Sequence, residues 1–170
     1  FAEHFFWIAS AMSGNGDGTH NMWDNEDQFF YDVLCLPNGQ TTLLKVRSLV
    51  GILPLCAATV FPPDLGERYP EMAKRVLLFL ADHSQLREGM TRRNEMGTVL
   101  LSIMDESKLR SVLKRMLDEN EFLSPYGIRS ISRYHATNPY IFYVNGEQHR
   151  VDYWPAESES GMFGGNSNWR

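Results

Sequence analysis

The sequence is poor in cysteine and in basic residues, and each shortage excludes a class of protein. Its 170 residues include two cysteines, Cys35 and Cys56, too few for a disulfide framework. Both lie in apolar runs, so we expect buried thiols. They also favour, weakly, a reducing and therefore cytoplasmic location. The net charge of −5 argues against a nucleic-acid partner, which would normally require a basic surface.

Long apolar runs are also missing. The longest, residues 49–61, is interrupted by Gly51 and Pro54 and is shorter than the ~20 residues that cross a bilayer. We therefore expect a buried core helix there, and no membrane partner. No signal-peptide pattern is visible. The chain opens without Met inside a helical pattern and closes in a Gly/Asn-rich loop, which suggests an internal fragment of a longer chain.

The remaining composition predicts a folded core, because 43% of the residues are hydrophobic and 22% are charged. Apolar residues at helical spacing predict three amphipathic helices, at residues 1–12, 70–83 and 107–117, the last capped by Ser107. Alternation and turn residues predict two β-hairpins, at residues 29–46 and at 140–153 around Asn145-Gly146. Residues 86–96 are expected to form a loop. The pattern predicts a mainly α fold, residues 1–170 forming one unit with two inserted hairpins.

Common catalytic and cofactor motifs are absent from the sequence. It shows no Ser-His-Asp order, phosphate-binding loop or dinucleotide fingerprint. The five histidines lack metal-ligand spacing, and the Gly/Asn/Asp run at residues 13–18 lacks the closing Glu of a calcium loop. We therefore expect no cofactor and no metal.

Several loops place aromatic side chains beside carboxylates, amides or guanidinium groups. A pyranose has an apolar face that stacks on an aromatic ring and a rim of hydroxyls that suits planar polar partners. The candidate sugar-binding residues are Trp23, Asp24, Tyr126, Arg129, Asn166, Trp169 and Arg170. Each also has a structural interpretation. Trp23 would anchor its loop, Asp24 would belong to a solvated acidic turn, and Arg129 would pair with a structural carboxylate.

Four segments carry a resemblance to a known family: Trp23–Asp32, Leu44–Gly51, Glu121–Ser130 and Ser160–Arg170. They look like parts of glycoside hydrolase family 63, in its microbial, glucosidase-like branch, related to mannosyl-oligosaccharide glucosidase. The resemblance covers nearly the whole chain and is weakest over residues 62–106.

The resemblance implies a partial (α/α)6 barrel and an inverting α-glycosidase, in which an acid and a base lie ~6.5–9.5 Å apart. By the resemblance, the acid precedes Phe1 and the base follows Arg170, so no catalytic residue is expected here. Asp24, Glu26 or Glu159 would be the alternatives. Trp169 would shape the subsite of the cleaved sugar and Arg170 would bond its hydroxyls, with Tyr126 and Arg129 at the same mouth.

The implied partners are a carbohydrate substrate and the rest of the same barrel. Two other hypotheses remain open. The chain would be a non-catalytic carbohydrate-binding or interaction module if it bound sugar by itself, and an α-helical scaffold if sugar had no effect.

Overall fold

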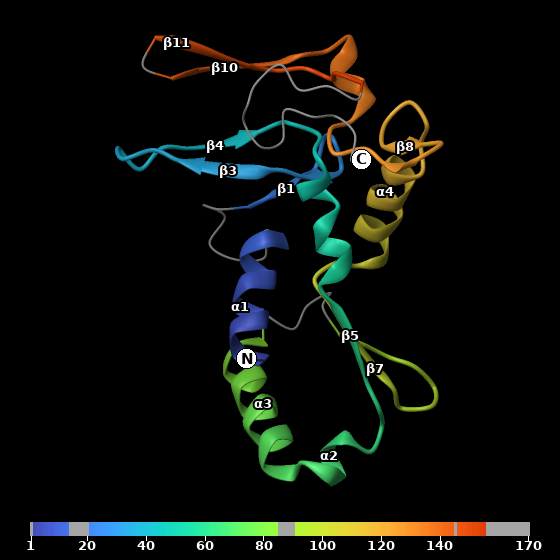
Figure 1. Cartoon of the computed structure of the whole chain (residues 1–170). Coiled ribbons are helices and arrows are strands. Elements are labelled where there is room, and N and C mark those ends of the chain that lie inside the picture. The colour runs from blue at the N-terminus through green and yellow to red at the C-terminus, as the bar shows by residue number, and fades with distance from the viewer. Residues whose placement is uncertain (1, 14–20, 85–90, 145, 156–170) are drawn as a thin grey trace.

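The structure is a computed structural model that describes residues 2–13, 21–84, 91–144 and 146–155, and Figure 1 shows an elongated molecule. Its α-helices are α1 (Ala2–Ser13), α2 (Leu65–Arg68), α3 (Pro70–Asp82) and α4 (Glu106–Met116). Its 3-10 helices include η1 (Leu49–Gly51), η2 (Leu53–Cys56) and η4 (Arg133–Ala136). Its strands are β1 (Trp23–Asp24), β2 (Phe29–Phe30), β3 (Asp32–Cys35), β4 (Thr41–Leu44), β5 (Ala58–Phe61), β6 (Thr91–Arg93), β7 (Val99–Ser102), β8 (Leu123–Ser124), β9 (Gly127–Ile128), β10 (Tyr140–Val144) and β11 (Glu147–Val151).

The prediction of a mainly α, partial (α/α)6 barrel is wrong. The described residues form five small antiparallel sheets beside short helices, and the helices do not ring a common axis. Strand pairing takes up much of the chain that the apolar spacing assigned to helices or loops. None of the helices in the described part of the chain is long and apolar enough to cross a membrane.

Both predicted hairpins are confirmed. β3 pairs with β4 from Asp32↔Leu44 to Cys35↔Thr41, and β10 pairs with β11 from Tyr140↔Val151 to Val144↔Glu147. The first hairpin is shorter than expected, because β2 pairs with β1 instead. Cys35 ends β3 with an exposed side chain, and Cys56 is exposed as well, so the expectation of buried thiols is wrong.

Residues 49–61 do not form the predicted core helix. They fold into η1, η2 and strand β5, because Gly51 and Pro54 divide the apolar run. Gly51 lets η1 approach β2 closely: a Cβ at this position would collide with the Phe29 ring and the Phe30 carbonyl oxygen. The start of the run, η1, therefore packs on the core, and its last four residues form strand β5.

The apolar core lies where β2, α4 and the segment after α4 meet. Phe29, Val112 and Phe122 have no solvent exposure, and the Phe29 and Phe122 rings stack with their centroids 5.8 Å apart. One end of α1 joins this core through Phe6 and Ala9. The core fixes the position of α4 against the loop between β1 and β2.

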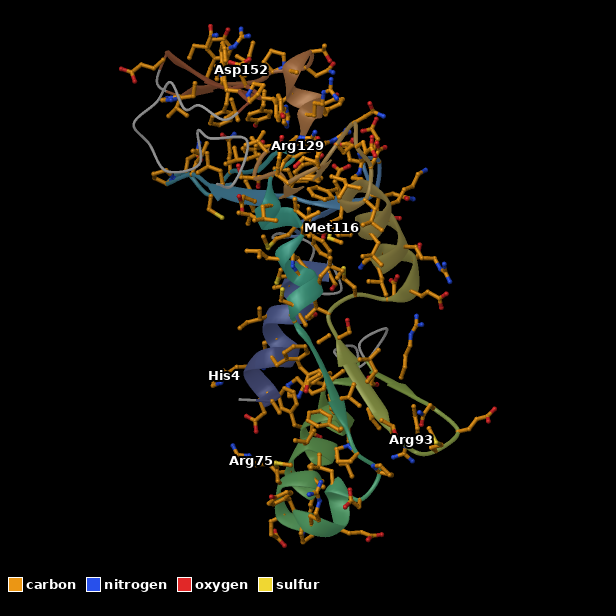
Figure 2. The ribbon with its side chains drawn as sticks, turned by 45° about the vertical axis from the view of Figure 1, so that its right-hand side comes forward. His4, Arg75, Arg93, Met116, Arg129 and Asp152 are labelled. Atoms are coloured by element: carbon orange, nitrogen blue, oxygen red, sulfur yellow. The ribbon has the colours of Figure 1, made fainter. Side chains whose placement is uncertain are left out.

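The opposite end of the molecule is thin. It consists of α2, α3 and the sheet of order β5-β7-β6. Within the loop predicted at residues 86–96, residues 91–93 form strand β6, and residues 86–90 lie outside the described residues. Helix α3 begins at Pro70, as predicted, and contacts α1. Arg75 and Arg93 lie at this end in Figure 2, far from Arg129 and Asp152.

Candidate functional site

A buried ion network around Arg47 joins three segments that are far apart in the sequence. The Arg47 Nη1 atom lies 2.7 Å from a carboxylate oxygen of Glu121, and its Nη2 atom lies 3.0 Å from one of Asp27. The guanidinium also lies over the Tyr134 ring, 3.8 Å from its centroid. Arg47 follows β4, Asp27 lies between β1 and β2, and Glu121 follows α4. The network therefore joins the loop between β1 and β2, the segment after β4 and the segment after α4.

Glu121 is the most heavily bonded carboxylate of the network. Besides Arg47, it accepts hydrogen bonds from Arg115 at 2.6 Å and from the Ser132 hydroxyl. Its backbone carbonyl accepts from Arg133 N–H at 2.9 Å. A buried charge is tolerated when it is paired and hydrogen-bonded in this way. We conclude that Glu121 is structural, because its charge is already balanced.

Asp27 stays ionised at neutral pH. Burial raises its pKa, but the hydrogen bonds from Arg47 and Tyr31 and the charges of Arg47 and Lys45 together outweigh that effect, and the pKa lies below its usual value. Tyr31 donates to Asp27 at 3.1 Å, and burial raises the pKa of Tyr31 to about 12. Tyr31 therefore remains a neutral donor.

A polar cleft opens beside this network, between α4 and the β1–β2 loop. Its volume is about 300 Å³, and it is lined by Asp27, Gln28, Ser111, Lys114, Arg115, Asp118 and Glu121. Its walls therefore combine carboxylates, an amide, a hydroxyl and two kinds of cation. Such a mixture of donors and acceptors suits a neutral, polyhydroxylated ligand better than an anion.

Gln28 has a backbone conformation that is unusual for its residue type. Its φ is +50°, in the left-handed region, and it is the residue that closes the β1–β2 loop. Its side-chain oxygen accepts a 2.9 Å hydrogen bond from the Ser111 hydroxyl. Left-handed non-glycine residues are concentrated at functional sites. The conformation holds the Gln28 amide at the rim of the cleft.

Several groups on the cleft wall have hydrogen-bonding capacity left over. In the described part of the chain, the ammonium group of Lys114 has no hydrogen bond or ion pair, and the amide NH2 of Gln28 has no acceptor. Asp118 uses one carboxylate oxygen to accept from Asn120 N–H at 2.8 Å. These three groups, rather than the balanced Glu121, are free to meet a ligand.

The structure places the predicted residues Trp23 and Asp24 beside the network, outside the cleft lining. Trp23 is buried, with its ring 4.8 Å from that of Phe30, so it anchors its loop. Asp24 pairs with Lys45 at 2.9 Å and accepts from Asp27 N–H at 2.7 Å. Burial raises the pKa of Asp24, but the Asp27 and Lys45 hydrogen bonds outweigh it and hold the pKa below its usual value.

Arg129 and Tyr126 lie in different surroundings. Arg129 is buried and donates to the carbonyls of Glu119, Glu121 and Leu123, and to the Tyr153 hydroxyl at 3.1 Å. It organises the backbone that follows α4. Tyr126 is 96% exposed at the β8–β9 turn.

The remaining predicted residues, Asn166, Trp169 and Arg170, lie outside the described residues, as does the alternative acid Glu159. The other alternative, Glu26, has an exposed side chain 3.7 Å from the Lys45 ammonium. Within residues 2–13, 21–84, 91–144 and 146–155, no three His, Cys, Asp or Glu side chains are grouped to hold a metal ion.

Sequence reasoning missed Arg47, Glu121 and Arg115 as partners, and missed Lys114 and Ser111 as cleft residues. Arg47 and Glu121 belong to segments that were singled out in the sequence, but neither residue was assigned a role there. Lys114 and Ser111 lie on the polar face of an amphipathic helix. Nothing in that pattern separates them from other solvated residues.

In the comparisons with known proteins, the chain matches one curated relative. The chain is 38% identical over 185 aligned residues to "Uncharacterized protein YMR196W" of Saccharomyces cerevisiae (strain ATCC 204508 / S288c). The match covers all of this chain but spans only 17% of the length of that relative. No protein-family model matches the chain, and no solved structure matches it.

Proposed function

We propose that this chain is part of an inverting α-glycosidase, glucosidase-like, and that the cleft beside α4 helps to hold its carbohydrate substrate. The observation that carries the proposal is the meeting of three segments that resemble glycoside hydrolase family 63. Asp27, Arg47 and Glu121 each come from a different one of them and form a single network. Three segments that resemble the same family and meet in one ion network are expected of a single functional unit.

The chemistry of the cleft supports a sugar as its ligand. Gln28, Lys114 and Asp118 offer uncommitted donors and an acceptor around a space of about 300 Å³. The hydroxyls of a pyranose both donate and accept hydrogen bonds, so they pair with such a mixture. Trp169, Arg170 and Asn166 remain proposed ligand contacts, and Tyr126, fully exposed, remains available for stacking. The acid and the base belong to other parts of the longer enzyme.

The test uses the longest natural polypeptide that contains this chain. It is incubated with a panel of α-glycosides, and the anomer first released is identified by proton NMR. Release of the β-anomer from an α-glycoside supports the proposal, since inversion is the outcome of two well-separated carboxyl groups. If no α-glycoside is hydrolysed, the enzymatic proposal fails. Sugar binding without hydrolysis would then favour a carbohydrate-binding module.

Two variants connect the activity to the cleft. Lys114→Met and Asp118→Asn each remove a group that is free to meet a ligand, and each should lower kcat/KM about tenfold, the effect of one lost hydrogen bond of ~1.4 kcal/mol. Arg110→Met is the matched control, because its side chain is exposed and outside the cleft lining. Equal activity in all three variants would remove the cleft from the proposal.

A further inference from the structure

Gln28 carries a side chain at a backbone position that suits glycine. Its φ of +50° lies in the left-handed region, which glycine adopts without strain and other residues adopt less often. Side chains at such positions persist where the surrounding structure holds them, and they gather at ligand sites. The Gln28 side chain is exposed, so packing in the core does not compensate for the conformation. The contacts of its terminal amide therefore explain why a side chain is held there.

The Ser111 hydroxyl fixes the direction in which the Gln28 amide faces. It donates a 2.9 Å hydrogen bond to the side-chain oxygen of Gln28. A primary amide has one carbonyl oxygen and one NH2 group, on different sides of its plane axis, so a bond that holds the oxygen towards α4 leaves the NH2 directed away from Ser111. Both residues line the polar cleft beside α4. Gln28 therefore meets a ligand in this cleft as a donor.

The next cleft residues of α4 follow Ser111 on the same side of the helix. Lys114 and Arg115 come three and four residues later, the spacing at which helical side chains are neighbours. Arg115 is committed to the Glu121 carboxylate at 2.6 Å, whereas the Lys114 ammonium has no ion pair or hydrogen bond in the described part of the chain. The cleft wall thus carries two uncommitted donors, which suit the oxygen atoms of adjacent hydroxyls on a sugar ring.

We propose that the Gln28 amide is a specificity-determining donor of this cleft and that Ser111 is its positioning residue. The amide NH2 donates to a hydroxyl oxygen of a pyranose, and Ser111 holds the amide in the orientation that makes this donation possible. This role rests on the proposed function, because it takes the cleft as a sugar site.

The test measures the Kd of maltose, an α-linked glucose disaccharide, by isothermal titration calorimetry in the longest natural polypeptide that contains this chain. Gln28→Glu keeps an acceptor for the Ser111 hydroxyl but cannot donate, and Gln28→Met is neutral and cannot donate either. Each should weaken binding about tenfold, the effect of one lost hydrogen bond. Gln148→Glu and Gln148→Met are the matched controls and should bind as the parent does. Gln148 is exposed, lies outside the cleft lining and also accepts from a hydroxyl, that of Tyr143 at 3.2 Å.

Ser111 has its own pair of variants. Ser111→Ala should weaken maltose binding about threefold, because the amide is then free to turn. Ser111→Thr keeps a hydroxyl and should bind nearly as the parent does. In the Gln28→Met background, Ser111→Ala should have no further effect, since Ser111 acts only through the amide. A full effect in that background would mean that Ser111 contacts the sugar itself, which would overturn its positioning role.

Results at Gln28 can overturn the proposal in three ways. Equal maltose affinity in the parent, Gln28→Glu and Gln28→Met would make the amide a structural link between the β1–β2 loop and α4. A loss in Gln28→Met but not in Gln28→Glu would show that the Ser111 bond, and not donation to the sugar, carries the effect. No binding of maltose by the parent would remove the donor role, whereas hydrolysis of the α-glycoside panel, measured separately, would still decide the proposed function.

Discussion

The Nη1 atom of Arg47 lies 2.7 Å from Glu121, a residue 74 positions further along the chain. Both side chains are almost fully buried, about 11% and 12% exposed. This pair joins the hairpin half of the molecule to the segment after α4, together with backbone hydrogen bonds from Ser132 N–H to the Arg47 carbonyl and from Leu49 N–H to the Ser130 carbonyl. The walls of the cleft are therefore held together by contacts that neither half can make alone.

The first prediction concerns this pair. Arg47→Met should lower the free energy of unfolding by about 3–5 kcal/mol, because it leaves the buried Glu121 and Asp27 carboxylates without their shared cation. Urea titration measures the loss. Arg110→Met breaks the exposed ion pair with Glu106 at 2.8 Å and should cost under ~1 kcal/mol. Similar losses for the two variants would show that the buried network is dispensable.

The second prediction concerns the close approach at Gly51. Gly51→Ala should destabilise the protein by about 1–3 kcal/mol, since its Cβ would push η1 off the Phe29 ring. The matched control is Gly66→Ala, within α2, where the nearest atom is 3.9 Å away. Replacing a helical glycine there should stabilise by about 0.5–1 kcal/mol. Thermal unfolding midpoints should move in opposite directions. A shared direction would contradict the packing of η1 on β2.

The third prediction separates the sequence-based helix cap from the observed one. Ser107 was the expected N-cap of α4, but Asp105 occupies that position and accepts from Lys108 N–H at 2.8 Å. Asp105→Ala should therefore cost about 1 kcal/mol, whereas Ser107→Ala should change stability by less than about 0.5 kcal/mol. The comparison is made by chemical denaturation at neutral pH. The reverse order would restore Ser107 as the cap.

Short-range signals in the sequence predicted real elements. Asn145-Gly146 marked the β10–β11 hairpin, and Pro70 marked the start of α3. Both signals depend on backbone restrictions of neighbouring residues, so they hold without knowledge of the rest of the fold. The apolar run at residues 49–61 was ambiguous, because periodicity alone does not separate a core helix from a buried turn and strand.

The site was harder to predict than the elements. Asp27 and Glu121 meet on Arg47 across 20 and 74 residues, and no local pattern encodes such a pairing. Arg129 was assigned to sugar binding from its residue type, yet its guanidinium already donates hydrogen bonds to backbone carbonyls. Composition identifies residues able to bind a ligand. It does not say whether their side chains already have hydrogen-bond partners within the fold.

The last prediction concerns His135, which is buried and bonded at both ring nitrogens. Its Nε2 accepts a hydrogen bond from the backbone N–H of Arg47 at 2.9 Å, and its Nδ1 lies 2.8 Å from the backbone carbonyl oxygen of Asn138. The ring is therefore neutral, with its proton on Nδ1. Burial lowers its pKa from the ordinary value of 6.5, and the Arg47 charge adds to this, against opposing effects of the Asn138 carbonyl, Glu121 and Asp152. Protonation would break the Arg47 hydrogen bond and place two cations together.

The sign of the pH effect follows from linkage. Below pH 6.5 the unfolded chain binds a proton at His135 that the folded chain refuses, so stability falls as the pH drops from 6.5 towards the lowered pKa. The unfolding midpoint should decline over this range, and His135→Gln should flatten the decline while lowering stability at pH 8. His149→Gln, which removes an exposed imidazole of β11, is the matched control. An unchanged pH profile in His135→Gln would show that another group causes the decline.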